Sequence, residues 1–202
     1  IGMDNPYHYR NKAQFPVGID DKGSPVMGFF KKMSHEIIQL TTCYVQDKVN
    51  DTILEIIRKY IEQYKVTVYD EKTHKGSLRH VITKVGFNTH EIMIILVTKE
   101  KKLPRIDALI EMLDSKLPGL RTIVQNINPN KTNVILGKEN TVLFGDGIIE
   151  DTIKDLLFEI SPLSFYQINP VQTEVLYNKA LELANIEKDD IVYDIYCGIG
   201  TI

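Results

Sequence analysis

The chain has 202 residues, which is enough for one medium-sized domain with a hydrophobic core and part of a second domain. Hydrophobic residues make up 43% of it and charged residues 25%, a composition that is typical of folded globular proteins and argues against disorder. The formal net charge of −3 weighs weakly against nucleic-acid binding, because proteins that bind nucleic acids usually have a basic bias. A local basic patch can still exist on an acidic chain.

The sequence contains no export or membrane signal. No apolar run approaches the roughly 20 residues that a membrane helix needs, and the first residues lack the pattern of a signal peptide. The two cysteines, Cys43 and Cys197, lie far apart, which indicates a reducing compartment. We therefore expect a cytoplasmic protein with no membrane or DNA partner. Because the chain begins without Met and stops in a glycine-rich segment, we interpret it as an engineered or proteolysed fragment.

The first half of the chain predicts alternating strands and helices. Residues 15–19 and 25–30 are expected to form two short strands around a polar turn. Residues 47–64 place their apolar side chains on one helical stripe. Residues 78–87 and 91–98 are expected to form strands joined by a short polar turn. The second of these contains a continuous apolar run, which is typical of a central strand.

The next segments complete a first domain over residues 1–160. A helix is expected at 105–117, stopped by Pro118-Gly119, and a strand at 121–128. Residues 134–168 predict short strands with turns at Gly137 and at 145–147. The order up to residue 128 is ββαββαβ, which favours an α+β fold: a mixed sheet with helices on one face.

The character of the sequence changes near residue 161. Asn169 as N-cap, Pro170 at the first position and Gln172 as in a capping box predict the start of a helix that runs to about 185. Its expected buried stripe is Val175, Leu176, Ala180, Leu183 and Ala184. A strand at 191–196 and a glycine loop at 197–201 follow. Helix, strand and glycine loop in this order open a doubly wound α/β domain, so we place a second, truncated domain at 161–202.

Two features of the second domain point to a ligand. A glycine loop after a strand lets the backbone approach a ligand closely, although one Gly-x-Gly fits an ordinary turn equally well. Asp194 and Tyr196 lie at the expected ligand-binding end of that strand, and Tyr196 could equally be a core residue. Gln167, between two aromatic residues and a helix cap, suits an amino-acid moiety or a base edge. Taken alone, it is more often a surface residue in a linker.

Together these segments resemble the RNA (uracil-5-)-methyltransferases. The resemblance rests on Ser164-Phe165-Tyr166-Gln167-Ile168-Asn169-Pro170, Gln172-Thr173-Glu174, Leu176-Tyr177 and Asp194-Ile195-Tyr196-Cys197-Gly198-Ile199-Gly200-Thr201. Upstream segments resemble the version found in bacterial 23S rRNA enzymes: Tyr9-Arg10-Asn11-Lys12-Ala13-Gln14-Phe15-Pro16-Val17, Gly28-Phe29-Phe30, Gly86-Phe87, Ile123-Val124-Gln125-Asn126 and Thr132-Asn133-Val134-Ile135-Leu136-Gly137. The resemblance therefore covers nearly the whole chain.

The resemblance implies a Rossmann-like second domain that binds S-adenosyl-L-methionine. The residues that it implies as cofactor contacts are Gln167, Tyr196, Gly198, Gly200 and Thr201. In the family, a cysteine thiolate adds to C6 of uracil, C5 accepts the methyl group, and a base removes the C5 proton. That cysteine and base lie downstream, beyond residue 202, so no catalytic residue is expected here and the fragment is expected to be inactive. Cys197, inside the cofactor loop, is rejected as the nucleophile.

The resemblance also bears on RNA and metal binding. Arg10, Lys12 and Gln14 alternate along an extended stretch, so they share one face that could bind RNA phosphates or be simply solvated. The resemblance implies RNA as the partner, and 23S rRNA in particular. Lys31 and Lys32 form a second basic pair. Some family members hold a 4Fe–4S cluster, and Cys43 falls where its fourth ligand would be. One thiol cannot hold a cluster, so no metal site is expected in this chain.

Two other functions remain open from the sequence. One is a stand-alone RNA-binding module without catalysis, and the other is a different nucleotide-binding α/β enzyme such as a dehydrogenase. The gene beyond residue 202 would discriminate between them. A continuing α/β domain with a ribose-binding acidic residue and a late cysteine would favour the methyltransferase, and a stop codon would favour the module. A dehydrogenase would need a third glycine in the loop.

Overall fold

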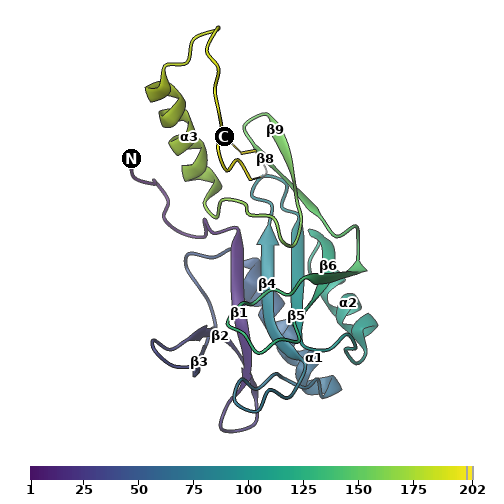
Figure 1. The fold of residues 1–202 in the computed structure, drawn as a ribbon. Coiled ribbons are helices and arrows are strands. Elements are labelled where there is room, and N and C mark those ends of the chain that lie inside the picture. Colours follow the sequence, from purple (N-terminus) through teal and green to yellow (C-terminus); the bar gives the residue numbers. More distant parts are fainter. Residues whose placement is uncertain (199, 202) are drawn as a thin grey trace.

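The computed structural model describes residues 1–198, 200 and 201, and its framework is a seven-stranded mixed sheet (Figure 1). The strand order is β3-β2-β1-β4-β5-β6-β7, and β8 and β9 form a separate hairpin. The elements in chain order are β1 (Lys12–Ile19), β2 (Pro25–Phe30), β3 (Ile37–Gln39), α1 (Val49–Tyr64), β4 (Leu78–Val85), β5 (Ile92–Thr98), α2 (Ile106–Asp114), β6 (Leu120–Ile127), β7 (Glu139–Phe144), β8 (Ile149–Ile153), β9 (Leu156–Ile160) and α3 (Pro170–Ala184).

The centre of the sheet follows the sequence prediction. Every residue of β4 and β5 is buried, and β5 lies between β4 and β6, which confirms it as a central strand. The β5–β6 pair is parallel and the other neighbouring strands are antiparallel. A parallel pair needs a crossover connection, and α2 provides it. The predicted α+β architecture with a mixed sheet is therefore confirmed.

Helices α1 and α2 cover one face of the sheet, as expected. The predicted stripe of α1 packs there, with Ile53, Ile57 and Tyr60 fully buried. One polar contact crosses this layer: the Thr83 hydroxyl of β4 donates to the side-chain oxygen of Asn50, at 2.6 Å. Because both groups are buried, this pairing avoids the cost of leaving either unsatisfied.

The opposite face is covered in its upper half by the β8–β9 hairpin (Figure 1). Apolar side chains of the hairpin, among them Ile149 and Ile160, pack on Met93 and Ile95 of β5. A fully buried carboxylate, Asp151, fixes the hairpin in place. It accepts hydrogen bonds of 2.9 Å from the backbone N–H groups of Phe87 and Asn88, in the β4–β5 turn.

Helix α3 begins as the sequence predicts. The Asn169 side chain accepts a hydrogen bond of 3.1 Å from the backbone N–H of Gln172, and Pro170 takes the first helical position. The expected return bond of a capping box does not form; the Gln172 amide nitrogen donates to the carbonyl oxygen of Gly2. None of the described helices is long and apolar enough to cross a membrane.

Two predictions beyond residue 170 are wrong. The expected buried stripe of α3 is mostly exposed, with Leu176 63% and Leu183 73% accessible, whereas Thr173 and Tyr177 are buried. Residues 191–196 form no strand. Both differences have the same cause: a strand needs a neighbour that shares its backbone hydrogen bonds, and an apolar stripe needs a layer to pack on. No described element lies against these surfaces, and in Figure 1 the helix projects away from the sheet.

Candidate functional site

The three residues that we predict to contact RNA line one groove, which we call the basic groove. Arg10, Lys12 and Gln14 line it together with Phe29 and Ile168, with Val45 and Gln46 completing the wall. The side chains that alternate with these three, at positions 11, 13 and 15, are buried. The groove is open because β2 pairs with β1 only from Val17 onward, which leaves the first half of β1 without a neighbour on that edge.

Positive charge in the groove is concentrated and poorly compensated. Burial and the nearby Arg10 guanidinium lower the pKa of the Lys12 ammonium. The lining contains no Asp or Glu, and Arg10 Nε and Gln46 Oε1 are buried without a hydrogen-bond partner among the described residues. An unpaired buried donor is costly, so an anion that accepted a hydrogen bond from Arg10 Nε would be stabilised there.

A second lysine lies beside Lys12. Lys84 of β4 is its direct cross-strand partner, although like charges in that position are unfavourable. Lys84 is 5% exposed, and its ammonium donates to the backbone carbonyl oxygens of Ser161 (2.7 Å) and Ser164 (2.8 Å). Burial, with a further contribution from Lys12, lowers the pKa of Lys84 to about 8. Sequence reasoning missed this residue, although a lysine in the strand predicted at 78–87, next to the expected central strand, was a signal for it.

The segment that carries Gln167 is attached to the beginning of β1. The Asn11 side-chain amide donates to the carbonyl oxygen of Gln167 at 3.0 Å, and the Asn11 backbone N–H donates to that of Ile168 at 3.1 Å. The Gln167 side chain is half-buried. Because Ile168 also lines the basic groove, the predicted cofactor motif and the predicted RNA contacts form one continuous surface.

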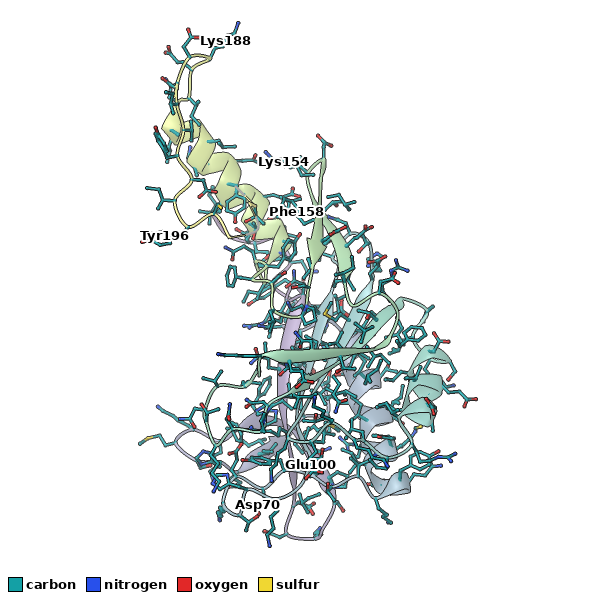
Figure 2. The ribbon with its side chains drawn as sticks, turned by 45° about the vertical axis from the view of Figure 1, so that its right-hand side comes forward. Asp70, Glu100, Lys154, Phe158, Lys188 and Tyr196 are labelled. Atoms are coloured by element: carbon teal, nitrogen blue, oxygen red, sulfur yellow. The ribbon has the colours of Figure 1, made fainter. Side chains whose placement is uncertain are left out.

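The other predicted cofactor residues lie along the final segment. Tyr196 is 99% exposed, so it is not a core residue here, and Figure 2 shows it well away from the sheet. Gly198 and Gly200 have φ of +60° and +73°, and an added Cβ would meet no atom within 4 Å. The Thr201 hydroxyl lies 3.0 Å from that of Tyr177, which brings the loop back to α3. Ile199, between the two glycines, lies outside the described residues.

These loop residues and Gln167 do not form an enclosed site. No hydrogen bond within the described ranges joins Gln167 to Tyr196, Gly198, Gly200 or Thr201. The loop offers open backbone on one side, which is compatible with close approach by a ligand.

The two cysteines differ in exposure. Cys43 is half-buried and Cys197 is exposed, and both are free thiols. Among the residues that the structure describes, no group of three or more His, Cys, Asp or Glu side chains could hold a metal ion.

Comparison with known proteins shows that the whole chain is similar to proteins named RNA methyltransferases. No family model matches it. A protein of Clostridium tetani named an uncharacterized RNA methyltransferase is 52% identical over 202 residues, and one of Oceanobacillus iheyensis with the same description is 51% identical over 203 residues. Both alignments include the whole chain, which spans 44% of the length of each relative.

One solved structure is similar to nearly the whole chain. It is the tRNA (uracil-54, C5)-methyltransferase of Pyrococcus abyssi in complex with S-adenosyl-L-homocysteine, with a TM-score of 0.80 and 28% identity. The match covers 98% of this chain and 45% of that protein. The chain is thus related over its whole length to RNA methyltransferases. The sequence motifs indicate a resemblance to the RNA (uracil-5-)-methyltransferases, and the solved structure confirms that resemblance.

Proposed function

We propose that the chain is part of an enzyme that transfers a methyl group from S-adenosyl-L-methionine to C5 of a uridine in RNA. The observation that carries the proposal is the alignment of the entire chain with named RNA methyltransferases at 42–52% identity. The geometry supports it, because Asn11 joins the basic groove to the Gln167 segment. The alternatives of a stand-alone RNA-binding module and of a dehydrogenase have no comparable support.

The cofactor would bind between Gln167 and the final loop, and it would supply the methyl group. Gln167 would hold its amino-acid part through an amide that both donates and accepts. Gly198 and Gly200 keep the backbone open to it, Tyr196 offers an aromatic ring, and Thr201 a hydroxyl. In the whole protein, a cysteine and a general base downstream of this chain would act on the uracil ring. Residues 161–202 would then be the first part of a Rossmann-like domain.

Residues 1–160 would contact the RNA. Arg10 and Lys12 can neutralise phosphates, and Gln14 can donate to phosphate oxygens, which positions a strand without reading its sequence. The upstream motifs favour 23S rRNA as the substrate, and the solved relative's tRNA specificity makes tRNA the competing candidate. We place the enzyme in the cytoplasm, where both RNAs are found. Cys43 alone does not fit a 4Fe–4S cluster, so no step is assigned to one.

The test uses the whole protein that contains this chain. Incubation with S-adenosyl-L-methionine and either a 23S rRNA or a tRNA transcript should produce 5-methyluridine, detected by mass spectrometry of nucleosides. Gln167→Leu should raise the cofactor KM, whereas Gln63→Leu, at the exposed end of α1, should not. Methylation of another base, or of neither RNA, would refute the proposal. Methylation of tRNA alone would refute the choice of rRNA.

A further inference from the structure

The end of the sheet remote from the glycine loop contains a polar, aromatic-lined pocket. Two neighbouring hollows meet there and share Phe30, His35, Glu71, Arg79 and His80. Asp70, which lines one of them, lies at the bottom of Figure 2, and Tyr196 lies toward the top. We call the five shared residues the His80 pocket. It lies outside the site described above.

His80 and Arg79 each place a buried nitrogen without a partner at this pocket, and His80 is the one that makes no other side-chain hydrogen bond in the described part of the chain. It is 7% exposed, and its Nδ1 is buried without a hydrogen-bond partner in the described part of the chain. Burial and the neighbouring Arg79 lower the pKa of His80 to about 4, so the ring is neutral near pH 7. A neutral imidazole has one donor and one acceptor, and leaving either buried and unpaired is costly. A ligand that reached Nδ1 would remove that cost.

The walls of the pocket have defined chemistry. The rings of Phe30 and His35 lie edge to face at 5.7 Å, and both are exposed, so they offer a stacking surface. Glu71 provides a carboxylate 3.6 Å from Arg79. Arg79 itself is structural: it donates to the backbone carbonyl oxygens of Asn128 and Asn130, and stacks on Tyr69. Glu71 pairs with Arg79 through Oε1, so the acceptor left for a ligand is its second carboxylate oxygen, and the exposed surface beside it is aromatic.

We propose that the His80 pocket binds an unpaired RNA base that carries an exocyclic amino group, such as cytosine. The aromatic pair would stack on the base, the Glu71 carboxylate would accept from the amino group, and His80 would bond another position on the base edge. Uracil lacks the amino group, so the pocket would hold a base other than the uridine to be methylated. Lys31 and Lys32, directly after Phe30, can contact the adjoining phosphates. The inference rests on the proposed RNA substrate.

The experiment compares two RNAs that differ at the base edge. Fluorescence anisotropy measures binding of the chain to short single-stranded oligomers of cytidine and of uridine, equal in length and at one salt concentration. We expect the cytidine oligomer to bind at least about fivefold more tightly. Equal affinities for the two oligomers would overturn the proposal.

Two pairs of variants identify the pocket as the source of the preference. Glu71→Gln should abolish the preference for cytidine, because an amide can also donate to the uracil carbonyl. The charge-matched control is Glu62→Gln on α1, which should retain it. Phe30→Ala should weaken cytidine binding, whereas Phe87→Ala, of similar exposure in the β4–β5 turn, should not. A cytidine preference that survives both Glu71→Gln and Phe30→Ala would also overturn the proposal.

The outcome is separable from that of the proposed function. If the whole protein methylates uridine but the chain shows no cytidine preference, only the proposal for the His80 pocket is refuted. If the cytidine preference depends on Glu71 but the whole protein methylates no uridine, only the proposed function is refuted.

Discussion

The side-chain amide of Asn11 donates a 3.0 Å hydrogen bond to the backbone carbonyl oxygen of Gln167, although 156 positions separate the two residues in sequence. The backbone N–H of Asn11 also donates to Ile168, and Asn11 is 7% exposed. Asn11 lies between Arg10 and Lys12 in the sequence. It thus fixes the position of the Gln167 segment relative to these two residues. The proposed RNA and cofactor contacts are held together by this attachment.

Replacing Asn11 should loosen the Gln167 segment. Asn11→Ala removes the side-chain donor and leaves the Gln167 carbonyl unpaired, so we expect the free energy of unfolding to fall by about 1–2 kcal/mol. Amide hydrogen exchange at residues 166–168 should become faster. Urea denaturation and exchange measured by mass spectrometry test this, with the exposed Asn133→Ala as control. Unchanged exchange at 166–168 would show that the bond does not hold the segment.

Lys84 should make stability depend on pH. Its pKa is about 8 in the folded chain and 10.5 when unperturbed, so between these values the unfolded chain binds more protons. The free energy of unfolding should therefore rise with pH across that window, by at most about 1.4 kcal/mol per pH unit. Below pH 8 the cost of burying the ammonium is fully present.

The matched variants isolate this contribution. Lys84→Met removes the titrating group, so its unfolding free energy, measured in urea from pH 8 to pH 10, should rise less than that of the wild type. Lys59→Met, on the exposed side of α1, should follow the wild type. Parallel curves for Lys84→Met and the wild type would mean that Lys84 does not titrate in this range.

Asp151 should stabilise the hairpin that covers the sheet. Asp151→Asn replaces an acceptor of two backbone N–H groups with an amide, whose NH₂ would face one of those donors. Because the site is fully buried, we expect a loss of about 2–3 kcal/mol in the free energy of unfolding. Asp155→Asn, exposed in the β8–β9 turn, is the control. Equal unfolding midpoints for the two variants would contradict this role.

The basic groove should account for part of the salt dependence of RNA binding. If Arg10 and Lys12 each neutralise a phosphate, Arg10→Gln with Lys12→Gln should reduce the slope of log affinity against log salt by about 1.4 for single-stranded RNA. The control is Lys59→Gln with Lys116→Gln, which lie on the helical side of the sheet. Equal loss of slope in both double variants would assign the effect to net charge alone.

Local pattern was sufficient to predict much of this fold. The strands β4 and β5, helix α1 and the Asn169 cap follow from periodicity and capping, which depend on residues close in sequence. The alternation of Arg10, Lys12 and Gln14 also predicts that their side chains share one face. The structure shows in addition that this face lines a groove. Strand β3 was not predicted, because it has only three residues and depends on β2 for its hydrogen bonds.

Contacts between distant segments could not be predicted in this way. The attachment of Asn11 to Gln167 and of Lys84 to Ser161 depends on how the chain returns to β1 after the hairpin. The pattern at 191–196 predicts a strand, but a strand also requires a partner, and local sequence does not supply one. Likewise, the apolar residues of α3 identify a surface that can be buried, not one that is buried.

Ile168 forms part of the wall of the basic groove, whereas Arg10, Lys12 and Gln14 are the first side chains of that wall to be synthesised. During translation, the nascent chain therefore has the cationic strand long before it has the complete groove. The groove is finished only when residue 168 has left the ribosome and docked beside Asn11. The RNA contact proposed for this groove would therefore become complete only after residue 168 has been synthesised.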